Sequence, residues 1–189
     1  MAAIVAARMT EQAYRELALT DAGKLVELWD GEPREKPAMS IEHNWLMAKL
    51  DHLLQPQLDW ETFQVRVNTG RLRRPGRNYY VPDVAVIPAA AAHALRTAPG
   101  SLEIYDQSLP LVVEVWSPST GTYDVTEKLG AYQRRGDEEI WYLHPYQRTL
   151  TVWRRQGDGS YHERVYQEGI VRPSSLPGVA IDLGELFDG

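Results

Sequence analysis

Two acidic residues stand inside strongly apolar stretches of the sequence, where their carboxylates could bind a metal ion. Glu114 interrupts the run Leu111-Val-Val-Glu-Val-Trp116, which has the composition of a strand buried on both faces. Removing an ionised carboxylate from water costs several kcal/mol unless it is paired or coordinates a metal. Glu114 is therefore expected to bind a metal or, alternatively, to pair with an arginine or face a solvated edge.

Asp83 stands at the head of a second apolar stretch, Val81-Pro-Asp-Val-Ala-Val-Ile87. Pro82 has no backbone donor, so this point is expected to be an edge, a strand start or a bulge, where a side chain can be exposed. A turn aspartate that simply ends the strand is the alternative. On neighbouring strands, Asp83 and Glu114 would form a carboxylate pair of the kind that holds Mg²⁺ together with waters and a substrate phosphate.

Chemistry on a phosphate also needs a cation that stabilises the developing charge, and Lys128 is the candidate. It lies on a helix that is predicted to begin at Asp124 and to end near Gly136. On this helix Asp124, Lys128 and Tyr132 share one face at four-residue spacing. The alternative is a surface pair between Lys128 and Asp124, which would contribute little to stability.

A series of motifs running nearly end to end resembles a known family. The series consists of Leu25-Val-Glu-Leu-Trp-Asp-Gly31, His43, Pro82-Asp83, Glu114-Val-Trp-Ser-Pro-Ser-Thr120, Asp124, Lys128, Tyr132, Glu139-Ile-Trp-Tyr-Leu-His-Pro145 and Leu176-Pro-Gly-Val-Ala-Ile-Asp-Leu183. It is similar to the Uma-two family of restriction-endonuclease-like proteins, a branch of the PD-(D/E)XK nuclease superfamily. The resemblance implies a Mg²⁺-dependent or Mn²⁺-dependent endodeoxyribonuclease. Asp83 and Glu114 would hold the metal, and a metal-activated water would attack a DNA phosphate.

The sequence departs from the superfamily pattern at one position. The pattern has a lysine two residues after the glutamate, where this chain has Trp116. The resemblance implies that Lys128 replaces that lysine, so that the catalytic set is Asp83, Glu114 and Lys128. Glu27, His43 and Tyr132 are expected to be accessory residues. The alternatives for the first two are a surface glutamate of a hairpin and a helix histidine with a local hydrogen bond.

An arginine-rich segment lies directly before Asp83. Residues 62–82 contain no acidic residue and five arginines, which are Arg66, Arg71, Arg73, Arg74 and Arg77. Guanidinium groups suit phosphate oxygens, so the last four are predicted to contact a DNA backbone. A solvated hairpin tip is the alternative. The net charge is −6, so the rest of the chain carries −11, and DNA contact is expected on one face only.

The elements expected to position these residues alternate between helices and strands. Helices are predicted over residues 10–19, over 41–54 between a Ser40 cap and Pro56, and over 124–136. Strands are predicted over residues 24–30, 60–68, 79–87, 109–116, 139–143, 149–154 and 161–166, with an Asp30-Gly31 hairpin turn and a loop with one helical turn over 88–108.

This order of elements favours an α/β fold in a single domain over residues 1–189. The expected architecture is a restriction-endonuclease-like mixed β-sheet flanked by helices, with an N-terminal hairpin and a C-terminal strand meander.

Composition and missing motifs exclude several other classes of protein. Cysteine is absent, which excludes disulfides, thiolate metal sites and a cysteine nucleophile. The sequence has neither a glycine-rich phosphate loop nor a Gly-x-Ser-x-Gly elbow. No apolar run approaches the roughly 20 residues that span a bilayer, so a cytoplasmic protein without a membrane partner is expected.

Two functional hypotheses remain. The first is a nuclease that acts on DNA as a homodimer, because many nucleases of this kind must cut two strands. The second is a catalytically inactive protein of the same fold that binds nucleic acid or a protein partner. The displaced lysine keeps this second hypothesis open.

Overall fold

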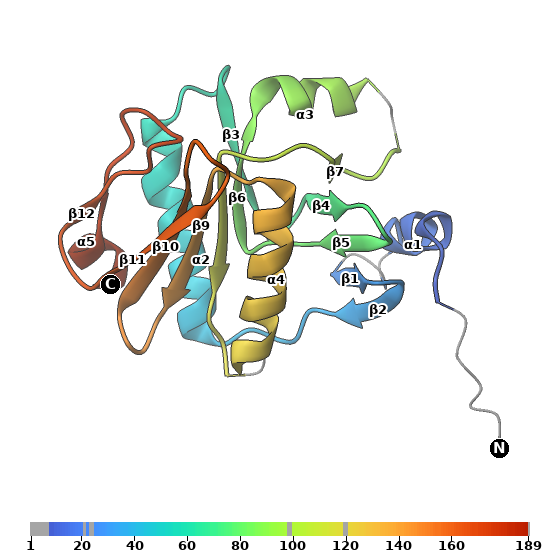
Figure 1. The fold of residues 1–189 in the computed structure, drawn as a ribbon, viewed down its shortest axis with the longest axis horizontal. Helices are drawn as coiled ribbons and strands as arrows, with labels where there is room; N and C mark the ends of the chain where they lie inside the picture. Colours follow the sequence, from blue (N-terminus) through green and yellow to red (C-terminus); the bar gives the residue numbers. More distant parts are fainter. Residues whose placement is uncertain (1–7, 21, 23–24, 98–99, 119–120, 189) are drawn as a thin grey trace.

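Two mixed β-sheets form the framework of the structure, a computed structural model (Figure 1). It describes residues 8–20, 22, 25–97, 100–118 and 121–188, and from residue 121 to 125 the backbone only. The larger sheet has the strand order β11-β10-β9-β8-β6-β3, and the smaller one has the order β2-β1-β5-β4-β7. The predicted α/β class is confirmed, although the strands form two large sheets and a separate two-stranded pair rather than one sheet.

The larger sheet carries most of the core. Its strands are β3 (Phe63–Val67), β6 (Val84–Pro88), β8 (Leu111–Val115), β9 (Glu139–His144), β10 (Thr149–Arg155) and β11 (Tyr161–Tyr166). Neighbouring strands are antiparallel except β8 and β9, which the crossover helix α4 (Gly121–Arg135) connects in parallel. The predicted C-terminal meander, β9 to β11, is confirmed. A short pair, β12 (Ile170–Val171) and β13 (Ile181–Asp182), follows it.

Helices cover both faces of the larger sheet, as Figure 1 shows with α2 behind it and α4 in front. Leu46 and Leu50 of α2 (Ile41–Leu54) share a core cluster with Val113 of β8. On the opposite face, Tyr132 of α4 shares a cluster with Val112. The 3₁₀ turn η1 (Gln55–Gln57) follows α2, and α5 (Leu183–Phe187) packs beside it. Among the described residues, no helix has the length and apolar character needed to cross a membrane.

The smaller sheet is built from two hairpins and one short parallel strand. Its strands are β1 (Val26–Trp29), β2 (Glu32–Glu35), β4 (Arg71–Arg74), β5 (Asn78–Tyr80) and β7 (Ile104–Tyr105). The predicted first hairpin is confirmed, because β1 and β2 pair antiparallel across Asp30 and Gly31, which both have positive φ. The helix α1 (Glu11–Ala18) packs on this sheet through Tyr14.

Two predictions about the middle of the chain are wrong. The expected strand 79–87 is split into β5 and β6, which belong to different sheets. The break falls at Pro82, which cannot donate to a strand ladder. Residues 88–108, expected as a loop with one helical turn, contain the eight-residue helix α3 (Ala89–Arg96) and β7. Helix α3 is rich in alanine, which has the highest helix propensity of all residues, and this explains why a full helix forms here.

The C-terminal end of helix α4 agrees with the predicted helix over residues 124–136, whereas its N-terminal end does not. It begins at Gly121, before the predicted start at Asp124, whose side chain lies outside the described residues. It ends at Arg135, and Gly136 follows with a φ of 79°. This end agrees with the prediction, since glycine commonly follows the last turn of a helix in the left-handed conformation.

Candidate active site

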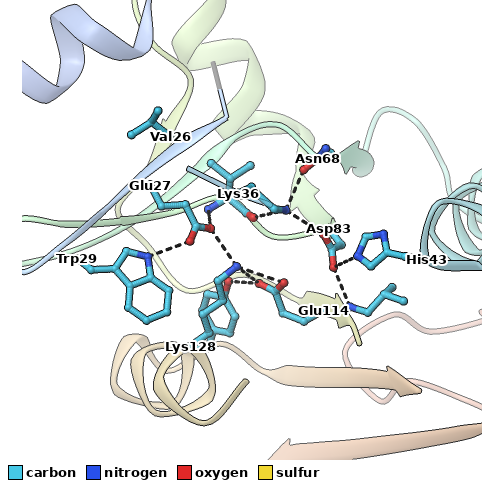
Figure 2. Close-up of polar contacts among 12 residues, drawn as sticks. Val26, Glu27, Trp29, Lys36, His43, Asn68, Asp83, Glu114 and Lys128 are labelled. Atoms are coloured by element: carbon cyan, nitrogen blue, oxygen red, sulfur yellow. Dashed lines mark hydrogen bonds and ion pairs between the residues drawn. The ribbon is translucent and has the colours of Figure 1, made fainter. Parts of the chain in front are cut away.

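Asp83 and Glu114 lie side by side where the two sheets meet (Figure 2). The strands β6 and β8 are antiparallel neighbours, and their register pairs Val84 with Val113. Asp83, directly before β6, is therefore level with Glu114 on β8. The backbone N–H of Val115 donates to Asp83 Oδ2 at 2.8 Å. The structure thus brings together the two acids predicted to bind a metal.

The Asp83 carboxylate is buried and has a partner on each oxygen. Lys36 Nζ lies 2.8 Å from Oδ1, and His43 Nε2 lies 2.9 Å from Oδ2. Lys36 also donates to Asn68 Oδ1 and to the Val81 carbonyl oxygen. Burial raises the pKa of Asp83, but Lys36 and His43 outweigh it and hold that pKa below its usual value. Asp83 is therefore an ionised carboxylate in a fixed orientation.

The Glu114 carboxylate has fewer stabilising partners than Asp83. Tyr132 donates its hydroxyl to Oε1 at 2.5 Å, and Lys128 Nζ lies 3.3 Å from Oε1 and 3.4 Å from Oε2. Burial raises the pKa of Glu114 to about 7 despite the attraction of Lys128, and repulsion from Asp83 adds to the rise. Glu114 would accordingly gain from a further positive charge.

Lys128 links Glu114 to a third buried acid, Glu27. Lys128 Nζ lies 2.9 Å from Glu27 Oε1. Burial lowers the pKa of Lys128, but Glu114 and Glu27 outweigh it, so that the pKa is raised and the ammonium group stays protonated. Glu27 also accepts hydrogen bonds from the Val81 backbone and from Trp29 Nε1. Glu27 and Lys128 are both only 4% exposed. Glu27 is therefore not a surface glutamate of the hairpin, and Lys128 does not form a surface pair with Asp124.

The sequence analysis missed Lys36, although it is central to the site. Its backbone N–H donates to the Leu25 carbonyl at 3.0 Å and so extends the β1–β2 pairing by one residue. The Lys36 side chain thereby reaches from the end of the hairpin to Asp83, which lies directly before β6 of the larger sheet. In the sequence, only the position of Lys36 between the predicted hairpin and the predicted helix 41–54 sets it apart. That position does not show which acidic residue the lysine pairs with.

The four arginines predicted to contact DNA do not form one surface. Arg71 is buried and donates to the Tyr14 hydroxyl. Arg73 pairs with Glu11 and Asp106, at 3.0 Å in each case. Neither guanidinium is available to a DNA phosphate without breaking these contacts. Because Arg71 and Arg73 make these contacts, they do not form a solvated hairpin tip either.

The other two arginines of the segment lie near the turn of the β4–β5 hairpin. Arg77 adopts a φ of 64°, and its carbonyl accepts the Gly31 backbone N–H at 3.0 Å. The side chain of Arg74 lines a pocket beside the acid cluster. Of the four, Arg74 and Arg77 therefore stay candidates for nucleic-acid contact.

The donor set of this acid cluster fits a hard divalent cation. Asp83 and Glu114 supply carboxylate oxygens, which Mg²⁺ and Mn²⁺ prefer as ligands. The buried cluster has one more carboxylate than ammonium groups, since it contains Glu27, Asp83, Glu114, Lys36 and Lys128. Among the described residues, no three acidic, histidine or cysteine side chains are arranged to hold a metal by themselves. A cation here would take its other ligands from water and substrate.

Comparison with known protein families identifies the family of this chain. A family model named Uma2, described as "Putative restriction endonuclease", matches residues 11–184. The chain belongs to the Uma2 family. The matched range includes every residue of the acid cluster, and the resemblance inferred from the sequence motifs is confirmed. Membership of Uma2 indicates a nuclease, because the family is described as one.

A solved structure has the fold of this Uma2 chain. It is the crystal structure of a protein from Anabaena variabilis ATCC 29413, described as "a putative nuclease belonging to DUF820". The TM-score is 0.71 at 18% sequence identity, over 86% of this chain and 89% of that chain. At this identity the likeness shows the fold alone. None of the curated protein sequences matches the chain.

Proposed function

We propose that this Uma2 protein hydrolyses phosphodiester bonds of DNA at the cluster around Asp83 and Glu114, with Mg²⁺ or Mn²⁺. The observation that carries the proposal is the pair of buried carboxylates on adjoining strands, with the protonated Lys128 beside one of them. When bound, the cation supplies activation of a water molecule and neutralises charge on the phosphate.

The chain's own residues would orient the substrate and keep charge in place. Glu27 and Glu114 hold Lys128 protonated, so its ammonium group can donate to a phosphate oxygen as negative charge develops there. Tyr132 binds Glu114 Oε1, whereas Oε2 has only the 3.4 Å contact with Lys128 among the described residues. Oε2 is therefore the Glu114 oxygen best placed to serve as a metal ligand.

Lys36 and His43 would act on Asp83 as positioning residues. They occupy different oxygens of its carboxylate and fix its orientation. Each carboxylate oxygen has two lone pairs, so an oxygen that accepts one hydrogen bond can still bind a cation. Lys36 adds a second buried positive charge that would attract a phosphate to the site.

A cleavage assay tests the proposal. Wild-type protein, incubated with Mg²⁺ or Mn²⁺, is expected to cut at least one substrate among circular, linear and single-stranded DNA, and chelation should abolish cutting. Asp83→Asn and Glu114→Gln should each lower the rate by about 10²–10³-fold, since each removes a charge needed in the transition state. The exposed Glu168→Gln is the control and should cut normally. Undiminished cutting by either site variant would contradict the proposal.

The competing hypothesis, a catalytically inactive binding protein, predicts a different result. Such a protein would retain DNA or RNA equally with and without a divalent cation, and would leave it intact. For cleavage of both strands of a duplex we propose a homodimer, which sedimentation of the protein alone and with DNA would test. The cytoplasmic location stays a prediction.

A further inference from the structure

A polar pocket of about 440 Å³ adjoins the acid cluster. It lies between the two hairpins of the smaller sheet and helix α4, and both Trp29 and Tyr80 line it. Trp29 Nε1 donates to Glu27 Oε2 at 2.9 Å, and Glu27 Oε1 in turn contacts Lys128. The Tyr80 ring contacts the ring of Tyr132, which binds Glu114. The side chains of Trp29 and Glu27 therefore lie in sequence between the pocket and the candidate catalytic Lys128.

Three arginines from three different elements line this pocket. They are Arg34 of β2, Arg74 of β4 and Arg134 of α4. The Arg34 guanidinium lies over the Trp29 ring, 4.6 Å from its centroid. Burial raises the pKa of the Tyr80 hydroxyl, and the positive charge of Arg74 opposes this rise. An aromatic side chain thus orients one of the three guanidinium groups, that of Arg34.

The pocket keeps positive charge that the protein does not neutralise. Three carboxylates also line it, but Asp30 pairs with Arg8, and Glu32 lies 3.9 Å from Arg34. Arg74 and Arg134 form no ion pair with any residue that the structure describes, and Glu127 is the remaining acid. Two guanidinium groups therefore face one carboxylate, an arrangement that favours an anionic ligand.

A glycine in the middle of α4 makes room for Arg134. A Cβ atom at Gly130 would lie 3.2 Å from Arg134 Nη1, closer than side chains normally approach. Glycine inside a helix lowers its stability relative to alanine. Its presence at this position lets the guanidinium group fold back along α4, whereas a Cβ atom at residue 130 would require the group to shift by a few tenths of an ångström.

We propose that this pocket binds a phosphate group of the nucleic-acid strand that is cut. The proposal rests on the nuclease function proposed above and names a subsite for its substrate. Guanidinium forks match phosphate oxygens geometrically, and Arg74 and Arg134 are the two that have no carboxylate partner among the described residues. The ligand is either an internal phosphodiester or a terminal phosphate, which share this chemistry.

Binding of labelled oligonucleotides, measured by fluorescence anisotropy over a range of salt concentrations in the presence of a chelator, tests the pocket. Arg74→Ala and Arg134→Ala should each weaken binding. Each should also reduce the slope of log affinity against log salt by about 0.7–0.9, the loss of one phosphate contact. Arg96→Ala removes an exposed arginine from α3 and should change neither quantity. Wild-type affinity and slope in both pocket variants, or no binding by the wild type, would overturn the proposal.

The same assay distinguishes the two sources of phosphate. Oligonucleotides with a 5′-phosphate, a 3′-phosphate or hydroxyl ends are compared with a circular single strand. If the variants lose affinity only for one phosphorylated end, the pocket holds a terminal phosphate. An equal loss for all four, the circle included, assigns it to an internal phosphodiester.

A second variant separates the pocket from the overall stability of α4. Gly130→Ala should leave the melting temperature unchanged or raise it, and should weaken binding less than Arg134→Ala does, because the guanidinium group is kept and has only to shift slightly. A Gly130→Ala variant that weakens binding more than Arg134→Ala does would count against the assigned role of Arg134. Failure of the nuclease proposal gives a different result, in which the wild type binds through the two arginines but cuts nothing.

Discussion

Lys36 Nζ lies 2.8 Å from Asp83 Oδ1, and both side chains are almost fully buried. Lys36 lies at the end of the first hairpin of the smaller sheet, whereas Asp83 lies directly before β6 of the larger one. The ion pair therefore joins the two sheets at the position of the candidate metal site. Stability and catalysis are expected to compete here, because a cation bound by Asp83 would share its carboxylate with Lys36.

Lys36→Met is expected to destabilise the fold and to make it more dependent on metal. Breaking a buried ion pair by removing one partner typically costs about 3–5 kcal/mol, since the other charge is left uncompensated. A divalent cation should restore part of this loss by replacing the ammonium group. Chemical denaturation with and without Mn²⁺ measures both effects.

The control for this prediction is Lys49→Met, which removes a more exposed partner of Glu185. Such a pair contributes about 0–1 kcal/mol, and Mn²⁺ should not affect this variant differently from the wild type. The prediction for Lys36 is wrong if Mn²⁺ stabilises Lys36→Met no more than it stabilises the wild type.

Tyr132→Phe should destabilise the protein through Glu114. The substitution removes the hydroxyl that donates to Glu114 Oε1 and leaves a buried acceptor without this partner. The expected loss is about 1–3 kcal/mol in the free energy of unfolding. Tyr146→Phe removes an exposed hydroxyl that bonds Glu42 and should cost far less. Equal losses in the two variants would show that burial of the Tyr132 hydroxyl does not matter.

Glu27→Gln should lower the cleavage rate without weakening substrate binding. Glu27 holds Lys128 in place and keeps its pKa raised, so its loss acts on the candidate catalytic cation. We expect kcat to fall by about 10–100-fold, the effect typical of a residue that orients a ligand, with KM nearly unchanged. Glu35→Gln, an exposed residue of the same hairpin, is the control. A change in KM alone would assign Glu27 to substrate binding instead.

The sequence was sufficient to predict the elements that carry Glu114, because a charge inside an apolar strand is visible without any tertiary information. The hairpin turn at Asp30 and Gly31 and the end of α4 at Gly136 were equally accessible, since local backbone preferences determine them. The break at Pro82 was read as a strand start or edge, but the sequence did not show that β5 and β6 join different sheets.

Long-range pairing accounts for what the sequence analysis missed. Lys36 reaches Asp83, 47 residues away, only after the hairpin docks against the larger sheet. Arg73 pairs with Glu11 and Asp106, which are 62 and 33 residues distant. Composition shows that residues 62–82 are basic, but it does not show which of their arginines other parts of the chain neutralise.

The proposed function requires that Asp83 and Glu114 together bind a divalent cation. Titration of the wild type with Mn²⁺ by isothermal calorimetry tests it most directly, alongside Asp83→Asn, Glu114→Gln and the control Glu168→Gln. We expect a binding isotherm for the wild type and the control, and its loss in both site variants. Equal binding by all four proteins, or no binding by the wild type, would contradict it.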